Sequence, residues 1–208
     1  AGCVSSVDAG FISYESKYGL AGHYRKAVQS GSIKGNEHAC YTVISALRAA
    51  SVGVDFMPVK GLVNSELIDV NEYFSKVISP FSGEKYTVVK AIKPDYVIIH
   101  ANVADKNGNV GISAPKYDDI LMSRTGAKLI VTAEKIMPET YFAYSKEKAD
   151  IPGFMVDCVV HCPKGAAPCS CQNEYNIDEK DIKRFKEFKD STELDDYLES
   201  HVNNDRRN

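Results

Sequence analysis

Residues 93–112 read KPDYVIIHANVADKNGNVGI and predict a buried strand, a tight polar turn and a returning strand. The run Tyr96–Ile99 is continuously apolar, which is typical of a strand covered on both faces in the parallel sheet of an α/β protein. Asn107 and Gly108 supply the turn, because an Asn-Gly pair tolerates the positive φ angles of a hairpin. His100 and Asn102 follow the apolar run, and we expect polar side chains at this end of the sheet to line a cleft.

Length and composition limit the classes of protein to which the chain can belong. Its 208 residues can bury one sizeable core, so we expect a single domain over 1–208. A net charge of −3, without a block of Lys and Arg, argues against nucleic acid as a partner. No apolar segment reaches the ~20 residues that span a bilayer, and no signal peptide is recognisable, so the expected compartment is the cytoplasm.

Strands and helices are expected to alternate along the chain. Strands are predicted over 56–59, 95–101, 109–113, 128–133 and 153–161, and helices over 21–29, 39–51 and 118–125. The C-terminal tail, about 178–202, predicts one or two amphipathic helices, since Asp178 and Glu179 suit the positive end of a helix dipole. This alternation indicates an α/β fold in which helices flank a sheet.

Four of the six cysteines lie between 158 and 171 in a C-x3-C-x6-C-x-C pattern. A zinc or iron–sulfur site is one interpretation, but this spacing is not a standard pairing of zinc ligands. Cys158 lies in an apolar run where it would pack as a small hydrophobic residue, and disulfides are disfavoured in the cytosol. We therefore expect plain thiols and no metal at Cys158, Cys162, Cys169 and Cys171.

Five segments resemble, in the right order, the signatures of a known family. PDYVIIHANVADKNGNVGI is similar to "PDVAIIHAxxADxxGNxxI", and AGFISYESKYGLAGHYRKAVQSG to "GFExLGLAPxFRKAVExG". ALRAASVGVDFMPVKGLVNSEL resembles "LRAAALGxPFxPxRGxxGSDL". The segments 133–138 and 151–157 resemble "TAExIVP" and "IPGFxVDAVV". Together they identify the chain as similar to the A subunit of the family I CoA-transferases, of the glutaconate CoA-transferase type.

The resemblance implies a fold, an activity and a partner. The fold would be an open, mostly parallel sheet flanked by helices, CoA-transferase-like and of the ribose-phosphate-isomerase or glucosamine-phosphate-isomerase type. The enzyme would move CoA from an acyl-CoA to a free carboxylic acid through a glutamyl-CoA intermediate. The nucleophilic glutamate of such enzymes belongs to the B subunit, so no catalytic residue is expected in this chain. The CoA thioester is a substrate, no permanent cofactor is implied, and the B subunit of the CoA-transferase would complete a hetero-oligomer.

The start of the chain differs from the family pattern. The sequence opens on Ala1-Gly2-Cys3-Val4 rather than on Met, and reads as a strand already in progress. Members of the resembled family carry a further N-terminal segment with a Gly-rich loop at the active-site cleft. We therefore expect the chain to be N-terminally incomplete, which puts its activity alone in question.

Polar residues in three places are candidates for substrate binding. Glu37 and His38 precede a predicted helix, where a glutamate is more often an electrostatic cap than a base. Asn64 and Ser65 lie in a loop that the family places near the cleft, and Ser65 could instead cap a helix. His100 and Asn102 at a strand end are the third pair, although such a His is more often a satisfied structural residue than an acid or base.

Two further glutamates, and two positions that differ from the family pattern, also bear on the site. Glu66 shares the loop of Asn64 and Ser65, whereas Glu134 follows a predicted strand and would form a surface ion pair or a backbone cap. The resembled family reads "PxGAHPxS" where this chain has Ala167 in place of the His, which implies altered specificity or lost activity. Lys60 replaces a frequent Arg and would weaken a bidentate carboxylate clamp.

Two other functions remain open at the level of sequence. Relatives of the resembled family cleave a carbon–carbon ring bond in CoA thioesters from steroid breakdown, using water and a glutamate of the chain that corresponds to this one. Glu37 is the natural candidate for that glutamate here. A non-catalytic interaction module is the third interpretation. A partner that carries a glutamate in a Gly-rich context would favour the transferase.

Overall fold

The largest sheet of the molecule is built around the stretch quoted above. A computed structural model describes residues 2–146, 148–188 and 191–205. This sheet has the strand order β7-β6-β8-β9. Its strands are β6 (Tyr96–Asp105), β7 (Val110–Gly111), β8 (Lys128–Met137) and β9 (Cys158–His161). β6, β8 and β9 run parallel, and β7 returns antiparallel to β6.

One face of this sheet is buried and part of the other is open. Val97, Ile99 and Val131 point into the main core, where each is at most 3% exposed. Tyr96 and Ile98 alternate with them on β6 and are 59% and 65% exposed. Successive side chains of a strand point to opposite faces, so the strand that we expected to be covered on both sides has a bare apolar face at its start.

The turn after β6 is fixed by the side chain of Asp105. Its Oδ1 accepts hydrogen bonds from the backbone amides of Asn107 and Asn109, both at 2.9 Å, and its Oδ2 accepts from the Asn109 side chain at 2.8 Å. Gly108 has a φ of +81°, as the predicted Asn-Gly turn requires. The hairpin prediction is confirmed, and Asp105 is a structural residue because it is 1% exposed and its carboxylate is fully occupied by the turn.

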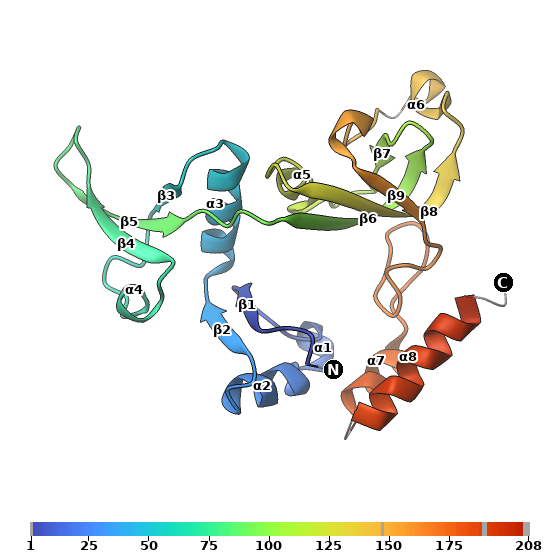
Figure 1. The fold of residues 1–208 in the computed structure, drawn as a ribbon, viewed down its shortest axis with the longest axis horizontal. Helices are drawn as coiled ribbons and strands as arrows, with labels where there is room; N and C mark the ends of the chain where they lie inside the picture. The colour runs from blue at the N-terminus through green and yellow to red at the C-terminus, as the bar shows by residue number, and fades with distance from the viewer. Residues whose placement is uncertain (1, 147, 189–190, 206–208) are drawn as a thin grey trace.

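The N-terminal half forms two smaller sheets joined by a helix. The elements are β1 (Ser6–Ala9), α1 (Glu15–Tyr18), α2 (Gly22–Gln29), β2 (Lys34–Glu37), α3 (Cys40–Ser51), β3 (Phe56–Val59), α4 (Leu67–Val70), β4 (Phe74–Ile78) and β5 (Lys85–Lys90). β1 and β2 pair in parallel, whereas β3, β5 and β4 form an antiparallel sheet. Figure 1 shows α3 standing between that antiparallel sheet and the main one.

Short helices and the C-terminal tail complete the described chain. They are α5 (Asp119–Met122), α6 (Tyr141–Tyr144), the 3₁₀ turn η1 (Gly153–Met155), α7 (Glu179–Lys186) and α8 (Ser191–Asp205). The tail lies beside the N-terminal helices (Figure 1), where Phe185 makes edge contacts with Tyr14 and His23. No helix among the described residues combines the length and apolar character that crossing a membrane demands.

Most expected elements are present, and the differences have local causes. The α/β class and the helices at 21–29 and 39–51 are confirmed, as is the helical tail. The predicted strand 153–161 is wrong in its first half, because Gly153 begins η1 where its backbone meets the hairpin turn at Asn107. The predicted helix 118–125 is only the single turn α5. The strands also divide among three sheets rather than one.

Candidate functional site

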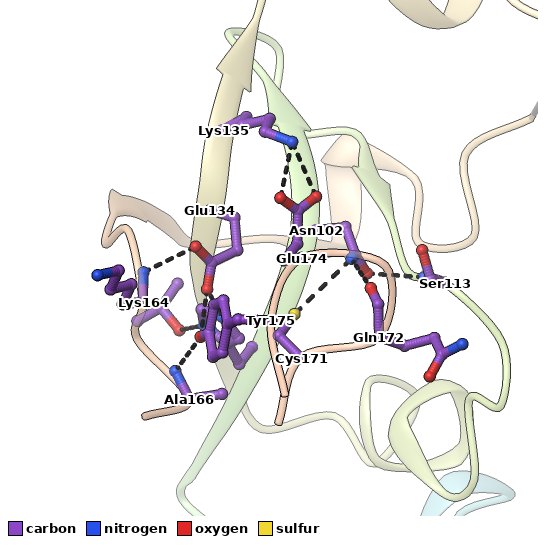
Figure 2. Close-up of polar contacts among 12 residues, drawn as sticks. Asn102, Ser113, Glu134, Lys135, Lys164, Ala166, Cys171, Gln172, Glu174 and Tyr175 are labelled. Carbon is purple, nitrogen blue, oxygen red and sulfur yellow. Dashed lines mark hydrogen bonds and ion pairs between the residues drawn. The ribbon is translucent and has the colours of Figure 1, made fainter. Parts of the chain in front are cut away.

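Glu134 is the centre of a polar network at the carboxyl end of β8 (Figure 2). Its Oε1 accepts a hydrogen bond from the Tyr175 hydroxyl at 2.6 Å and faces Nε2 of His100 at 2.7 Å. Its Oε2 accepts from the backbone amide of Lys164 at 2.7 Å. Glu134 is 8% exposed, so this carboxylate is buried and has a partner on each oxygen. The prediction that Glu134 forms a surface ion pair is wrong. The neighbouring Lys135 forms an ion pair instead, with Glu174.

The network gives the His100 ring a defined orientation. Nδ1 lies 2.8 Å from the Thr132 hydroxyl, which itself donates to the backbone carbonyl of Ile99 at 3.4 Å. The Thr132 hydroxyl can donate to Nδ1 or accept from it, because either tautomer of the ring fits these distances. Nε2 faces the Glu134 carboxylate, so both ring nitrogens have partners. These contacts support a structural role for His100.

Burial and hydrogen bonding shift the pKa of Glu134 in opposite directions. Burial alone would raise the pKa of Glu134, but hydrogen bonds from Tyr175, the Lys164 amide and His100 together hold that pKa below its ordinary value. Burial raises the pKa of the Tyr175 hydroxyl strongly, and its bond to the Glu134 carboxylate adds to the effect. Burial also raises the pKa of the Cys171 thiol. The network thus holds one carboxylate charged between groups that keep their protons.

Asn102 joins the sheet to the loop that follows β9. Its side-chain amide donates to the carbonyl of Gln172 at 2.7 Å and lies 3.7 Å from Sγ of Cys171, and its Oδ1 accepts from the Ser113 amide at 2.8 Å (Figure 2). Asn102 is 8% exposed. The sequence suggested that it binds substrate, but these bonds use its amide and its carbonyl oxygen to hold the loop. Asn102 also lines the pocket described next.

An open pocket of about 780 Å³ lies beside this network at the carboxyl ends of β6 and β8. Its lining residues are Asn102, Val103, Gly111, Ile112, Ser113, Ala114, Lys116, Lys135, Met137, Tyr141, Lys148, Asp150, Asn173 and Glu174. Lys116 pairs with Asp150, and Lys135 with Glu174. Ligands of α/β proteins commonly bind at the carboxyl ends of parallel strands, and the lysines here suit an anionic group.

Glu37 and His38 lie in a different part of the molecule. Glu37 ends β2 with an exposed side chain, so it does not start the helix as we expected. His38 is 3% exposed, its Nδ1 lies 3.3 Å from the Thr42 hydroxyl, and its ring packs against Tyr73 at a centroid distance of 5.0 Å. Burial lowers the pKa of His38, and the Asp8 carboxylate offsets this only in part. His38 is thus a packed residue at the base of α3.

Asn64 and Ser65 lie on the loop between β3 and α4, away from the Glu134 network along the chain and in Figure 1. Asn64 and Glu66 are exposed, and Ser65 Oγ accepts a hydrogen bond from the Leu67 amide at 3.2 Å. Ser65 thus makes a local bond just before α4, whose N-cap residue is Glu66. The six predicted substrate-binding residues form no single cluster: His100 and Asn102 share one region, and the other four lie in the N-terminal half.

Tyr175, Thr132 and Cys171 belong to the network but were not predicted as site residues. Cys171 was visible only as part of the cysteine run, in which the structure leaves Cys158 and Cys169 exposed and Cys162 half-buried. Tyr175 follows that run by four positions and carries no local signal. The loop after β9 places Tyr175 next to β8, and a local sequence pattern does not predict this long-range contact.

Comparisons with known proteins place this chain in a family. The model of the coenzyme A transferase family matches residues 4–162. The A subunit of glutaconate CoA-transferase from Acidaminococcus fermentans is 29% identical over 178 residues, which are 78% of this chain and 56% of that protein. The cholesterol ring-cleaving hydrolase IpdA subunit of Rhodococcus jostii is 28% identical over 200 residues, 90% of this chain and 66% of that protein.

Solved structures agree with the sequence comparisons. The crystal structure of the Acidaminococcus fermentans glutaconate CoA-transferase superposes with a TM-score of 0.87 at 26% identity, over 95% of this chain and 68% of that chain. The decarboxylase AibA/AibB, solved as a cysteine-to-serine variant, superposes with a TM-score of 0.85 at 28% identity, over 97% of this chain and 74% of that one. The chain thus spans about half the length of the glutaconate relative and belongs to the coenzyme A transferase family, as a relative of its A subunits.

Proposed function

We propose that this chain is the A subunit of a heteromeric CoA-transferase that moves CoA from an acyl-CoA to a free carboxylic acid. A glutamate of the B subunit would carry the CoA as a glutamyl thioester, and this chain would be active only with that partner. Its similarity to the A subunit of glutaconate CoA-transferase supports the proposal. Its cysteines are thiols rather than disulfides, which suits the cytoplasm as its compartment.

The observation that carries the partner proposal is the large surface of the chain. Its solvent-accessible area is 13819 Å². A compact monomer of 22.9 kDa has about 9,600 Å² by the usual scaling of area with mass. The difference is on the scale of an obligate interface between subunits. Large apolar side chains are exposed on this surface, among them Phe11, Val70, Phe81, Tyr117 and Phe154.

The chemistry proposed for the complex is covalent catalysis in two exchanges. The partner's glutamate carboxylate attacks the acyl thioester and releases the CoA thiolate, which leaves a mixed anhydride. The thiolate then attacks the glutamyl carbonyl and frees the first carboxylic acid. The second acid repeats these steps in reverse. We propose that this chain holds the carboxylate ends of both acids near the lysines of the open pocket, whose shape His100 and Asn102 support through the loop after β9.

The test is an exchange assay on this chain co-expressed with its B subunit. The complex receives glutaconyl-CoA or acetoacetyl-CoA together with isotope-labelled acetate, and mass spectrometry follows thioesters and free CoA. We expect labelled acetyl-CoA with little free CoA. Lys135→Ala in the pocket should raise the KM for the acid, whereas Lys93→Ala, which removes an exposed ion pair with Asp55, should leave it unchanged. Release of free CoA without labelled acetyl-CoA would refute the transferase.

A second candidate is a hydrolase of CoA thioesters. Two observations favour it: the similarity to the IpdA subunit extends over 90% of this chain, and Glu37 ends β2 as an exposed carboxylate that could activate water. Under this proposal Glu37→Gln abolishes turnover of the ring-containing thioester, and the equally exposed Glu66→Gln does not. Full hydrolysis by Glu37→Gln, or exchange of label into acetyl-CoA by the unmodified complex, would exclude Glu37 as the base.

A further inference from the structure

We propose that His100, Glu134 and Cys171 form a binding site for a divalent metal ion of the zinc type. One ligand atom from each residue, an imidazole nitrogen, a carboxylate oxygen and a thiol sulfur, lies within 4.8 Å of the other two. β6 supplies His100, β8 supplies Glu134, and the loop after β9 supplies Cys171. The ion would act on the loop that lines the open pocket and would take no part in the CoA transfer itself, so metal content tests this site separately from the exchange assay.

These three atoms match the ligand preferences of zinc. Zn²⁺ binds imidazole nitrogen, carboxylate oxygen and thiolate sulfur, with bond lengths of about 2.0–2.3 Å, and three protein ligands leave a fourth position for water. Ligand atoms around such an ion lie between about 3 and 4 Å apart, since tetrahedral geometry separates bonds of that length by this much. The 2.7 Å separation between Nε2 of His100 and Oε1 of Glu134 would widen to at least about 3 Å, and the atoms that lie up to 4.8 Å apart would draw closer.

Each proposed ligand already has the supporting contact that metal sites require. Nδ1 of His100 lies 2.8 Å from the Thr132 hydroxyl, so in the metal-bound form it would donate its proton there and leave Nε2 as the coordinating atom. The Lys164 amide and the Tyr175 hydroxyl hold the two oxygens of Glu134. The Asn102 amide lies 3.7 Å from Sγ of Cys171, where it would donate to the thiolate that forms when a metal ion binds (Figure 2). Outer contacts of this kind orient ligands and raise affinity.

Charge is the argument that a cation belongs between these groups. Nε2 of His100 lies 2.7 Å from Oε1 of Glu134, so the two atoms share either a proton on Nε2 or a metal ion. A proton serves only His100 and Glu134, whereas a metal ion also engages Cys171, which is 9% exposed beside the buried carboxylate.

The metal ion would fasten the loop after β9 to the sheet. This loop carries Asn173 and Glu174 into the lining of the open pocket, so the ion would stabilise one wall of that pocket. The proposal departs from the sequence-based expectation of plain thiols, and it does so with a different ligand set. Only Cys171 of the four clustered cysteines takes part, and His100 and Glu134 come from strands distant in sequence.

Metal content of the co-expressed complex tests the proposal directly. The complex is purified without chelator and measured by inductively coupled plasma mass spectrometry, alongside its Cys171→Ser and Cys169→Ser variants. Cys169 is the matched control, because it lies two positions away and is exposed. We expect about one zinc ion per copy of this chain in the unmodified protein and in Cys169→Ser, and at least a tenfold loss of bound metal in Cys171→Ser.

Cobalt substitution distinguishes this site from metal bound by the partner, because it reports directly on the ligands of the ion. Co²⁺ added to the chelator-treated complex should give a near-ultraviolet charge-transfer band that reports a thiolate ligand, and Glu134→Gln should weaken the Co²⁺ affinity at least tenfold. Circular dichroism confirms that each variant is folded. Absence of both metal and thiolate band in the unmodified protein, or equal metal in Cys171→Ser and Cys169→Ser, would show that the cluster is only a protonated hydrogen-bond network.

Discussion

His38 and His100 have the same kinds of neighbours at different distances. Each ring has a threonine hydroxyl near Nδ1 and a carboxylate near Nε2. For His38 the Thr42 hydroxyl is 3.3 Å away and Asp8 is 3.5 Å away. For His100 the corresponding distances, to Thr132 and to Glu134, are 2.8 and 2.7 Å.

These differences of less than 1 Å separate two roles. Nε2 of His38 has no hydrogen-bond partner among the described residues, and its ring lies against Tyr73 and Phe74. Its neutral form is favoured, because burial lowers its pKa. His100 instead belongs to a network with a charged carboxylate. Histidine therefore packs against aromatic rings at position 38 and joins a hydrogen-bond network at position 100. The hydrogen-bond distances distinguish the two roles.

The largest expected effect comes from removing the centre of the network. Glu134→Ala leaves His100, the Tyr175 hydroxyl and the Lys164 amide without their shared partner in a buried site. We expect the free energy of unfolding to fall by about 2–4 kcal/mol. Urea unfolding at one protein concentration measures it, and Glu66→Ala at an exposed position serves as control. A loss below about 0.5 kcal/mol, the range of surface substitutions, would mean that the network is not structural.

The two histidines can be compared by the same substitution. His100→Phe removes two hydrogen bonds and leaves the Glu134 carboxylate with fewer partners, so we expect a loss of about 2 kcal/mol. His38→Phe keeps the ring contacts with Tyr73 and Phe74. It removes only a long 3.3 Å contact with Thr42 and a nitrogen that lies 3.5 Å from Asp8, so its cost should stay below about 1 kcal/mol. Equal costs in the same unfolding assay would remove the distinction between the two regions.

Acid should weaken the fold through His38. Its pKa is lower in the folded than in the unfolded chain, so the neutral ring contributes stability above the unfolded value of 6.5. As pH falls below 6.5, the unfolded chain takes up a proton that the folded chain resists, and stability falls by at most about 1.4 kcal/mol per pH unit. His38→Phe should flatten this part of the stability profile. His161→Phe, at an exposed position, should leave it as it is.

The smallest expected effect on stability concerns the loop after β3. Ser65→Ala removes one hydrogen bond to the Leu67 amide and should cost less than about 1 kcal/mol, and Asn64→Ala should cost nothing measurable. If these residues bind substrate in the complex, each variant raises the KM for the carboxylic acid while its thermal midpoint stays close to the unmodified value. An unchanged KM in both variants would remove this loop from the proposed binding site.

Elements with a strong local signal were predictable from the sequence. Helix α3 follows from apolar residues at helical spacing, and the β6–β7 hairpin follows from its apolar run and the Asn-Gly turn. β2 has the sequence KGNE, which carries no apolar alternation, and it exists because it pairs with β1. The β4–β5 pair was likewise missed, since its strands gain their stability from each other and from β3.

The candidate site was only partly visible before the fold was known. His100 and Asn102 were selected because they follow a buried strand, and the structure puts both in the network. Glu134 was assigned to the surface from its position beside Lys135. The loop after β9 contacts both side chains, since Glu174 pairs with the exposed Lys135 and the Tyr175 hydroxyl donates to the buried Glu134. Nothing in the neighbourhood of Tyr175 predicts that its hydroxyl reaches a carboxylate 41 positions earlier.

The sequence by itself determined the family, the α/β class and the position of the central hairpin. These depend on motifs, periodicity and turn residues that act over a few positions along the chain. Only the tertiary structure decided which polar residues meet, because β6, β8 and the loop after β9 must first align before His100, Glu134 and Cys171 come within 4.8 Å. Local patterns set backbone conformation, whereas hydrogen bonding and ligand geometry depend on distances between segments that are far apart in sequence.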